Sequence, residues 1–148
     1  MNGGKFFFDT NVLLYMYSGA DLAKQTRAKE LFQHCTASGR MLLSTQVVQE
    51  FYAAGSRKLR IPRSELRDVA AGLLDLPLVT VRPSHILSAI QTEERYGISF
   101  WDALILAAAE SGGAEVLYTE DLNDGQQYGK VMVRNPFRSE GQSQPIPT

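Results

Sequence analysis

Four acidic side chains could do chemistry together in this sequence: Asp9, Glu50, Asp102 and Asp121. Asp9 ends a short apolar segment predicted as a buried strand, and Asp121 comes just after another predicted strand. Glu50 lies in the second turn of the helix that leaves the second predicted strand of the chain. Ligands of open α/β sheets bind outside the carboxyl ends of the strands. We therefore expect these three carboxylates at one edge of a sheet.

Asp102 follows less directly from the pattern, because the helix that it begins does not come straight after a strand. Each acid also has a purely structural interpretation. Asp9 and Asp102 suit helix caps, Glu50 a solvated helix face, and Asp121 a turn. Their joint position favours a site, because clustered carboxylates raise one another's pKa unless a cation neutralises them.

The donor set indicates which cation would bind. Cys35 is the only cysteine, and His34 and His85 are interpreted as surface or capping residues. Carboxylate oxygens without thiolate or imidazole suit Mg²⁺ or Mn²⁺ rather than zinc. Such an ion polarises a phosphoryl oxygen and generates hydroxide for in-line displacement. The sequence has no Gly-rich phosphate loop and no Gly-x-Ser-x-Gly motif, which disfavours other mechanisms.

Alternating strands and helices must position these acids. The predicted strands are Lys5–Phe8, Arg40–Ser44, Leu78–Val81, Glu115–Tyr118 and Lys130–Val133. The segments between them carry apolar residues at helical spacing, including a stripe that begins at Leu22 and another that begins at Trp101. Strands that are apolar throughout indicate a buried, parallel arrangement. We therefore predict an α/β fold, a three-layer α/β/α arrangement with a mostly parallel central sheet of four to five strands.

Bulk properties set the remaining limits. The 148 residues are enough for one domain, predicted over residues 1–138, with a flexible polar tail at 139–148. A net charge of −1 argues against coating nucleic acid by bulk electrostatics. No apolar run is long enough to cross a bilayer, and no signal peptide is recognisable. Together with the single cysteine, these features predict a cytoplasmic protein with no membrane association.

At its acids the sequence resembles the PIN-domain ribonucleases, and most closely the VapC-type toxins of VapBC toxin–antitoxin pairs. The resemblance runs from about residue 6 to residue 137. The matching segments are Phe8–Asn11, Ser44–Phe51 with Glu50, Phe100–Ile105 with Asp102, Tyr118–Gln126 with Asp121, and Val133–Phe137.

The resemblance implies roles for individual residues. Asp9, Asp102 and Asp121 would hold Mg²⁺ or Mn²⁺ directly or through water. Glu50 would hold a water of the metal or orient the attacking one, and the sequence leaves both roles open. The residues implied to support the acids by hydrogen bonding are Thr10, Asn11 and Thr119, with Asp124 as an additional acid. The resemblance also implies an RNA substrate, a homodimer, and a VapB-type antitoxin over the site.

The leading hypothesis is thus a metal-dependent endoribonuclease that acts as the toxin of a type II toxin–antitoxin system. Two alternatives remain: a structure-specific DNA nuclease, and a catalytically silent binding or dimerisation module. Arg57, Lys58 and Arg60 are candidate RNA-binding residues, although cations also suit the end of a helix. Lys24, Arg27 and Lys29 are interpreted as the solvated side of their helix.

Overall fold

The computed structural model describes residues 4–138, and the predicted tail at 139–148 lies outside this range. The helices are α1 (Thr10–Tyr15), α2 (Leu22–Ala37), α3 (Thr45–Arg57), α4 (Arg63–Leu74), α5 (Pro83–Tyr96) and α6 (Phe100–Ser111). The strands are β1 (Lys5–Phe8), β2 (Met41–Ser44), β3 (Leu78–Val79), β4 (Ala114–Tyr118), β5 (Gln127–Tyr128) and β6 (Val131–Arg134).

The strands form one sheet in the order β3-β2-β1-β4-β6-β5, and all neighbours are parallel except β5 and β6. The predicted α/β class and mostly parallel sheet are confirmed, but the sheet has six strands rather than four or five. The additional strand, β5, is only two residues long and turns back into β6 at Gly129, whose φ is 58°. Two residues are too few to give a recognisable alternation of apolar and polar side chains.

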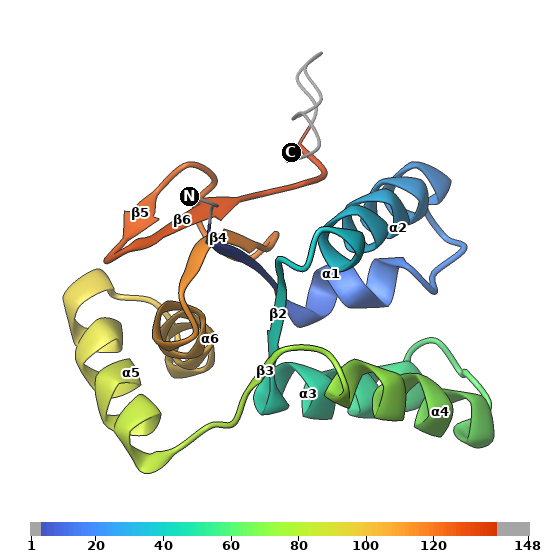
Figure 1. Ribbon diagram of the computed structural model, residues 1–148, viewed down its shortest axis with the longest axis horizontal. Coiled ribbons are helices and arrows are strands. Elements are labelled where there is room, and N and C mark those ends of the chain that lie inside the picture. Colours follow the sequence, from blue (N-terminus) through green and yellow to red (C-terminus); the bar gives the residue numbers. More distant parts are fainter. Residues whose placement is uncertain (1–3, 139–148) are drawn as a thin grey trace.

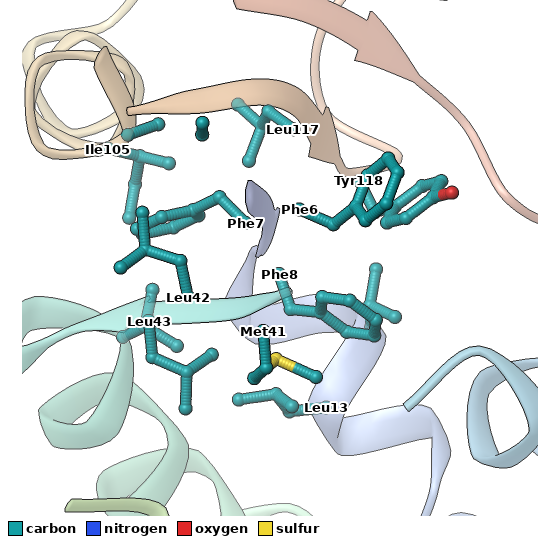
Figure 2. Close-up of a cluster of buried hydrophobic side chains, with 14 of the residues drawn as sticks. Phe6, Phe7, Phe8, Leu13, Met41, Leu42, Leu43, Ile105, Leu117 and Tyr118 are labelled. Carbon is teal, nitrogen blue, oxygen red and sulfur yellow. The ribbon is translucent and has the colours of Figure 1, made fainter. Parts of the chain in front are cut away.

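Helices cover both faces of the sheet, so the predicted three layers are also confirmed. Figure 1 shows α5 and α6 on one side of the strands and α1 to α4 on the other. The central strand β1 supplies the core between them. In Figure 2, Phe7 points toward Leu42 and Ile105, whereas Phe8 points away from them, toward Met41 and Tyr118. The Phe8 and Tyr118 rings lie 5.4 Å apart, edge to face.

Capping side chains fix where the helices near the sheet edge begin. Ser44 Oγ accepts from Val47 N at 3.3 Å, and Ser99 Oγ accepts from Asp102 N at 3.1 Å. Two residues of the predicted apolar stripes are exposed instead of buried, Leu22 at 69% and Trp101 at 62%. Both lie in the first turn of their helix. No helix within residues 4–138 is long and apolar enough to cross a membrane.

Candidate metal centre

Three of the four acids meet at one point of the structure. Asp9, Asp102 and Asp121 each offer a carboxylate oxygen within 4.8 Å of the others. Asp9 and Asp121 come together because β1 and β4 are adjacent parallel strands, with Phe8 opposite Tyr118 at their carboxyl ends. The first turn of α6 brings Asp102 to the same edge. The site therefore lies where parallel strands leave the sheet.

Asp9 is the buried member of the group, with 5% of its surface exposed. Its Oδ1 accepts from the Thr10 amide at 2.7 Å, and its Oδ2 accepts from Thr119 Oγ1 at 2.8 Å. Burial raises the pKa of Asp9 to about 7, the two hydrogen bonds oppose this, and the charges of Asp121 and Glu50 add to it. A cation at this point would offset both the burial and the like charges.

The fully buried Thr119 hydroxyl connects Asp9 to Asp121. It donates to Asp9 and accepts from Asn11 Nδ2 at 3.2 Å and from the Asp121 amide at 3.0 Å. A hydroxyl has one proton and two lone pairs, so all its hydrogen-bonding capacity is used. Asn11 Nδ2 also donates to Asp121 Oδ2 at 3.0 Å. These contacts fix the orientation of two carboxylates that would otherwise repel each other.

Glu50 lies beside the three acids and is held from two sides. Its Oε1 accepts from Thr10 Oγ1 at 2.7 Å, and its Oε2 accepts from Gln46 Nε2 at 3.1 Å. Sequence reasoning missed Gln46, although it precedes Glu50 by four residues and side chains at this spacing share a helix face. A polar residue one turn before a candidate acid was the signal that could have identified it.

Asp102 belongs to the acidic cluster and also lies at the capped start of α6, and its sequence pattern is compatible with both roles. Its amide donates to the capping Ser99 hydroxyl at the start of α6. Burial raises the pKa of its carboxyl, the Ser99 hydrogen bond lowers it, and the charges of Asp121 and Glu50 raise it again. The amino-terminal end of a helix carries a partial positive charge that partly offsets this crowding.

Asp124 is not brought into the cluster. Its Oδ1 accepts from the Asn135 amide at 2.9 Å, and its Oδ2 accepts from Arg138 at 3.3 Å. The carboxylate therefore holds the chain after β6. His85 is also structural, since its Nδ1 accepts from the Arg82 amide at 2.9 Å at the start of α5. It is a buried cap rather than a surface residue.

The predicted basic residues lie at the carboxyl end of α3 and just after it. Arg57, Lys58 and Arg60 are exposed, and Lys58 forms the carboxyl cap of that helix. Lys58 also lines a mostly apolar cavity of about 200 Å³ whose wall includes Asn11. Lys24 and Arg27 differ from the prediction, because neither is simply solvated. Lys24 pairs with Glu120, and Arg27 Nε donates to the Pro136 carbonyl at 3.0 Å.

The chemistry of the donor set fits a hard divalent cation. The converging ligand atoms are all carboxylate oxygens, which Mg²⁺ and Mn²⁺ prefer. The side chains that hydrogen-bond to these carboxylates are hydroxyls and amides, so they orient the acids without neutralising them. Fold and site together define an α/β protein with a cluster of carboxylates, suited to a hard divalent cation, at the carboxyl edge of a mostly parallel sheet.

Comparison with known proteins gives this class a family. The family model described as "PIN domain" matches residues 6–126, so the chain belongs to the PIN-domain family. A comparison of the sequence with curated proteins found no match.

Several solved structures have the same fold. A toxin–antitoxin complex from Klebsiella pneumoniae includes a chain 22% identical, with a TM-score of 0.67, over 90% of this chain and 98% of that one. VapC20 of Mycobacterium tuberculosis, described as a toxin that cleaves the Sarcin-Ricin loop, is 20% identical with a TM-score of 0.64, over 86% and 99% of the two chains. DNA-bound VapBC from Salmonella typhimurium matches at 19% identity and a TM-score of 0.64, over 88% and 97%. The fold is thus that of VapC-type PIN domains.

Proposed function

We propose that this protein is a Mg²⁺- or Mn²⁺-dependent endoribonuclease, the toxin of a VapBC-type pair. The observation that carries the proposal is the convergence of Asp9, Asp102 and Asp121 within 4.8 Å, beside Glu50. Membership of the PIN-domain family supports nuclease chemistry at such a site.

Each residue has a task in this reaction. Asp9, Asp102 and Asp121 would hold the cation, which supplies positive charge against the phosphoryl oxygens and acidifies water. Thr119 and Asn11 keep Asp9 and Asp121 oriented toward each other. Glu50, held by Thr10 and Gln46, offers a carboxylate that orients the attacking water and accepts its proton.

The similar structures support RNA as the substrate and a protein as the inhibitor. VapC20 is described as cleaving the Sarcin-Ricin loop, and two of the other similar structures contain a toxin with its antitoxin. We carry over to this chain an RNA substrate, a VapB-type antitoxin and a homodimer as parts of the proposal.

Lys58 is the basic residue with the best position to contact RNA. Lys58 and Asn11 line the same cavity, and Asn11 donates a hydrogen bond to Asp121. An ammonium there would bind a phosphate next to the scissile one. Arg57 and Arg60 are exposed on either side of Lys58 and would extend the contact along the RNA strand.

Labelled RNA and DNA oligonucleotides of one sequence test the proposal. The protein is incubated with each in 5′-labelled form with about millimolar Mn²⁺ or Mg²⁺, and with EDTA as the metal-free control. We expect cleavage of RNA only, lost with EDTA and in Asp9→Asn. Equal or better cleavage of DNA would instead favour a DNA nuclease, and no cleavage of either would favour a binding module.

A further inference from the structure

Gln46 lies between two of the four acids. It is on α3, only 5% exposed, and its Nε2 donates to Glu50 Oε2 at 3.1 Å and to the Trp101 carbonyl at 3.2 Å. Trp101 immediately precedes Asp102 in the first turn of α6. Because α3 and α6 cover opposite faces of the sheet, this one amide group joins the two helix layers above the strand ends (Figure 1).

The hydrogen bonds determine which way the amide faces. Both partners of Gln46 Nε2 are oxygen acceptors, so the reversed amide would direct its carbonyl oxygen at a carboxylate and at another carbonyl. In the observed orientation Gln46 Oε1 is buried, and within residues 4–138 it has no hydrogen-bond partner. An unpartnered buried acceptor destabilises a fold, whereas an apolar side chain of similar shape would avoid that cost.

We propose that Gln46 is a positioning residue, which sets the spacing between Glu50 and Asp102 and keeps Glu50 oriented for catalysis. This inference rests on the proposed metal-dependent cleavage. A neutral donor suits the task, because a lysine at this position would neutralise Glu50 and compete with the cation. The buried Oε1 and the donor Nε2 belong to the same amide group, so the side chain cannot have the donor without the oxygen. An apolar residue would lack both. Gln46 would therefore contribute to catalysis more than to stability.

Gln46→Met tests this, because methionine has a similar shape without the donor or the buried acceptor. With RNA and Mn²⁺ we expect kcat to fall roughly tenfold to a hundredfold, as for other residues that orient metal ligands. The KM for RNA should stay unchanged, and half-maximal activity should need more Mn²⁺. The melting temperature in EDTA should stay close to that of the parent, because removing the unpartnered acceptor offsets the loss of the two hydrogen bonds from Nε2. Gln49→Met is the matched control, since Gln49 is exposed on the same helix, and it should behave as the parent.

The outcomes separate this inference from the proposed function. If the parent cleaves RNA and Gln46→Met cleaves equally well, the positioning role is wrong while the function stands. A lower melting temperature in EDTA with a proportional loss of active protein would show that Gln46 only stabilises the fold.

A parent that neither cleaves RNA nor gains thermal stability with Mn²⁺ would overturn both. Should Gln46→Met fail to fold, Gln46→Glu keeps the side-chain shape and replaces the donor by a second carboxylate facing Glu50. Loss of cleavage in this variant is expected, and parental activity would overturn the inference.

Discussion

Glu120 and Asp121 are neighbours in one turn, yet their carboxylates have opposite surroundings. Glu120 accepts from Lys24 Nζ at 2.5 Å and from Tyr15 OH at 2.9 Å. The Lys24 ammonium also lies over the Tyr15 ring, 4.7 Å from its centroid. Asp121, one residue later, is held by the neutral amide of Asn11 and faces two other acids.

The same contrast separates two other acids near the sheet from the acidic cluster. Glu115 pairs with Arg40 at 2.7 Å, and Asp124 pairs with Arg138. Like Glu120, these carboxylates are neutralised by the chain's own cations. Within residues 4–138, the hydrogen bonds to Asp9, Glu50 and Asp121 come from hydroxyl and amide groups, which leaves the negative charge of these acids available to the proposed cation. We call Glu115, Glu120 and Asp124 the paired acids. We call Asp9, Glu50, Asp102 and Asp121 the clustered acids.

The largest effect is expected from Asp9→Asn, which removes one negative charge but can keep the cap of α1. Losing a metal ligand should lower the rate of RNA cleavage by at least about a hundredfold, because metal ions stabilise the transition state of phosphodiester hydrolysis by several kcal/mol. The rise of melting temperature with Mn²⁺ should also disappear. In EDTA the variant should melt no lower than the parent. Full cleavage by this variant would contradict the division into two groups of acids.

Thr119→Val should have the next largest effect. It removes the hydroxyl shared by Asp9, Asn11 and Asp121 while keeping the side-chain shape. We expect a loss of roughly tenfold to a hundredfold in cleavage and in Mn²⁺ affinity. Thr36→Val on α2, whose hydroxyl bonds only its own helix at Phe32, is the control. If both variants cleave equally, the hydrogen bonds do not orient the acids.

The pH dependence of the free energy of unfolding tests the surroundings of Asp9 without any RNA substrate. In the metal-free protein the pKa of Asp9 is raised from 3.8 to about 7, so the folded chain binds this proton more tightly than the unfolded chain. The free energy of unfolding should therefore fall by a few kcal/mol as pH rises from about 4 to 7. Melting curves in EDTA should show this fall for the parent and much less of it for Asp9→Asn. Identical slopes would exclude a raised Asp9 pKa.

Lys24→Met should affect stability more than cleavage. It removes the cation of a paired acid and leaves Glu120 partly buried beside Tyr15. A partly exposed pair of this kind contributes about 1 kcal/mol, so we expect a small drop in melting temperature and a retained Mn²⁺ response. Lys29→Met, exposed on the same helix, should change neither. Loss of the Mn²⁺ response in Lys24→Met would mean that Glu120 belongs to the metal centre.

Much of the fold was predictable because it depends on local patterns. The apolar run at Lys5–Phe8 is the central strand β1, as predicted, and the predicted strand Glu115–Tyr118 lies within β4. The carboxyl edge of a parallel sheet then gave the expected places of Asp9 and Asp121. Strand β5 was missed because its pairing with β6, rather than its own sequence, makes it a strand.

The partners of individual side chains were less predictable. The pairing of Lys24 with Glu120 joins residues 96 positions apart, and no local pattern indicates it. The same holds for the contact of Gln46 with the Trp101 carbonyl, which depends on how α3 and α6 pack around the sheet. Sequence spacing shows which residues share an edge or a face, whereas tertiary packing decides which of them touch.

The hydrogen bond from Thr119 to Asp9 spans 110 positions and has a consequence for protein synthesis. A ribosome adds Asp9 well before Asp121, and β4 must leave the exit tunnel before it can pair with β1. Until then the emerging chain contains the first acids without the partners that orient them. The carboxylates of Asp9, Asp102 and Asp121 therefore cannot converge during synthesis until β4 and the turn after it have left the tunnel, so the proposed activity could begin only after that point.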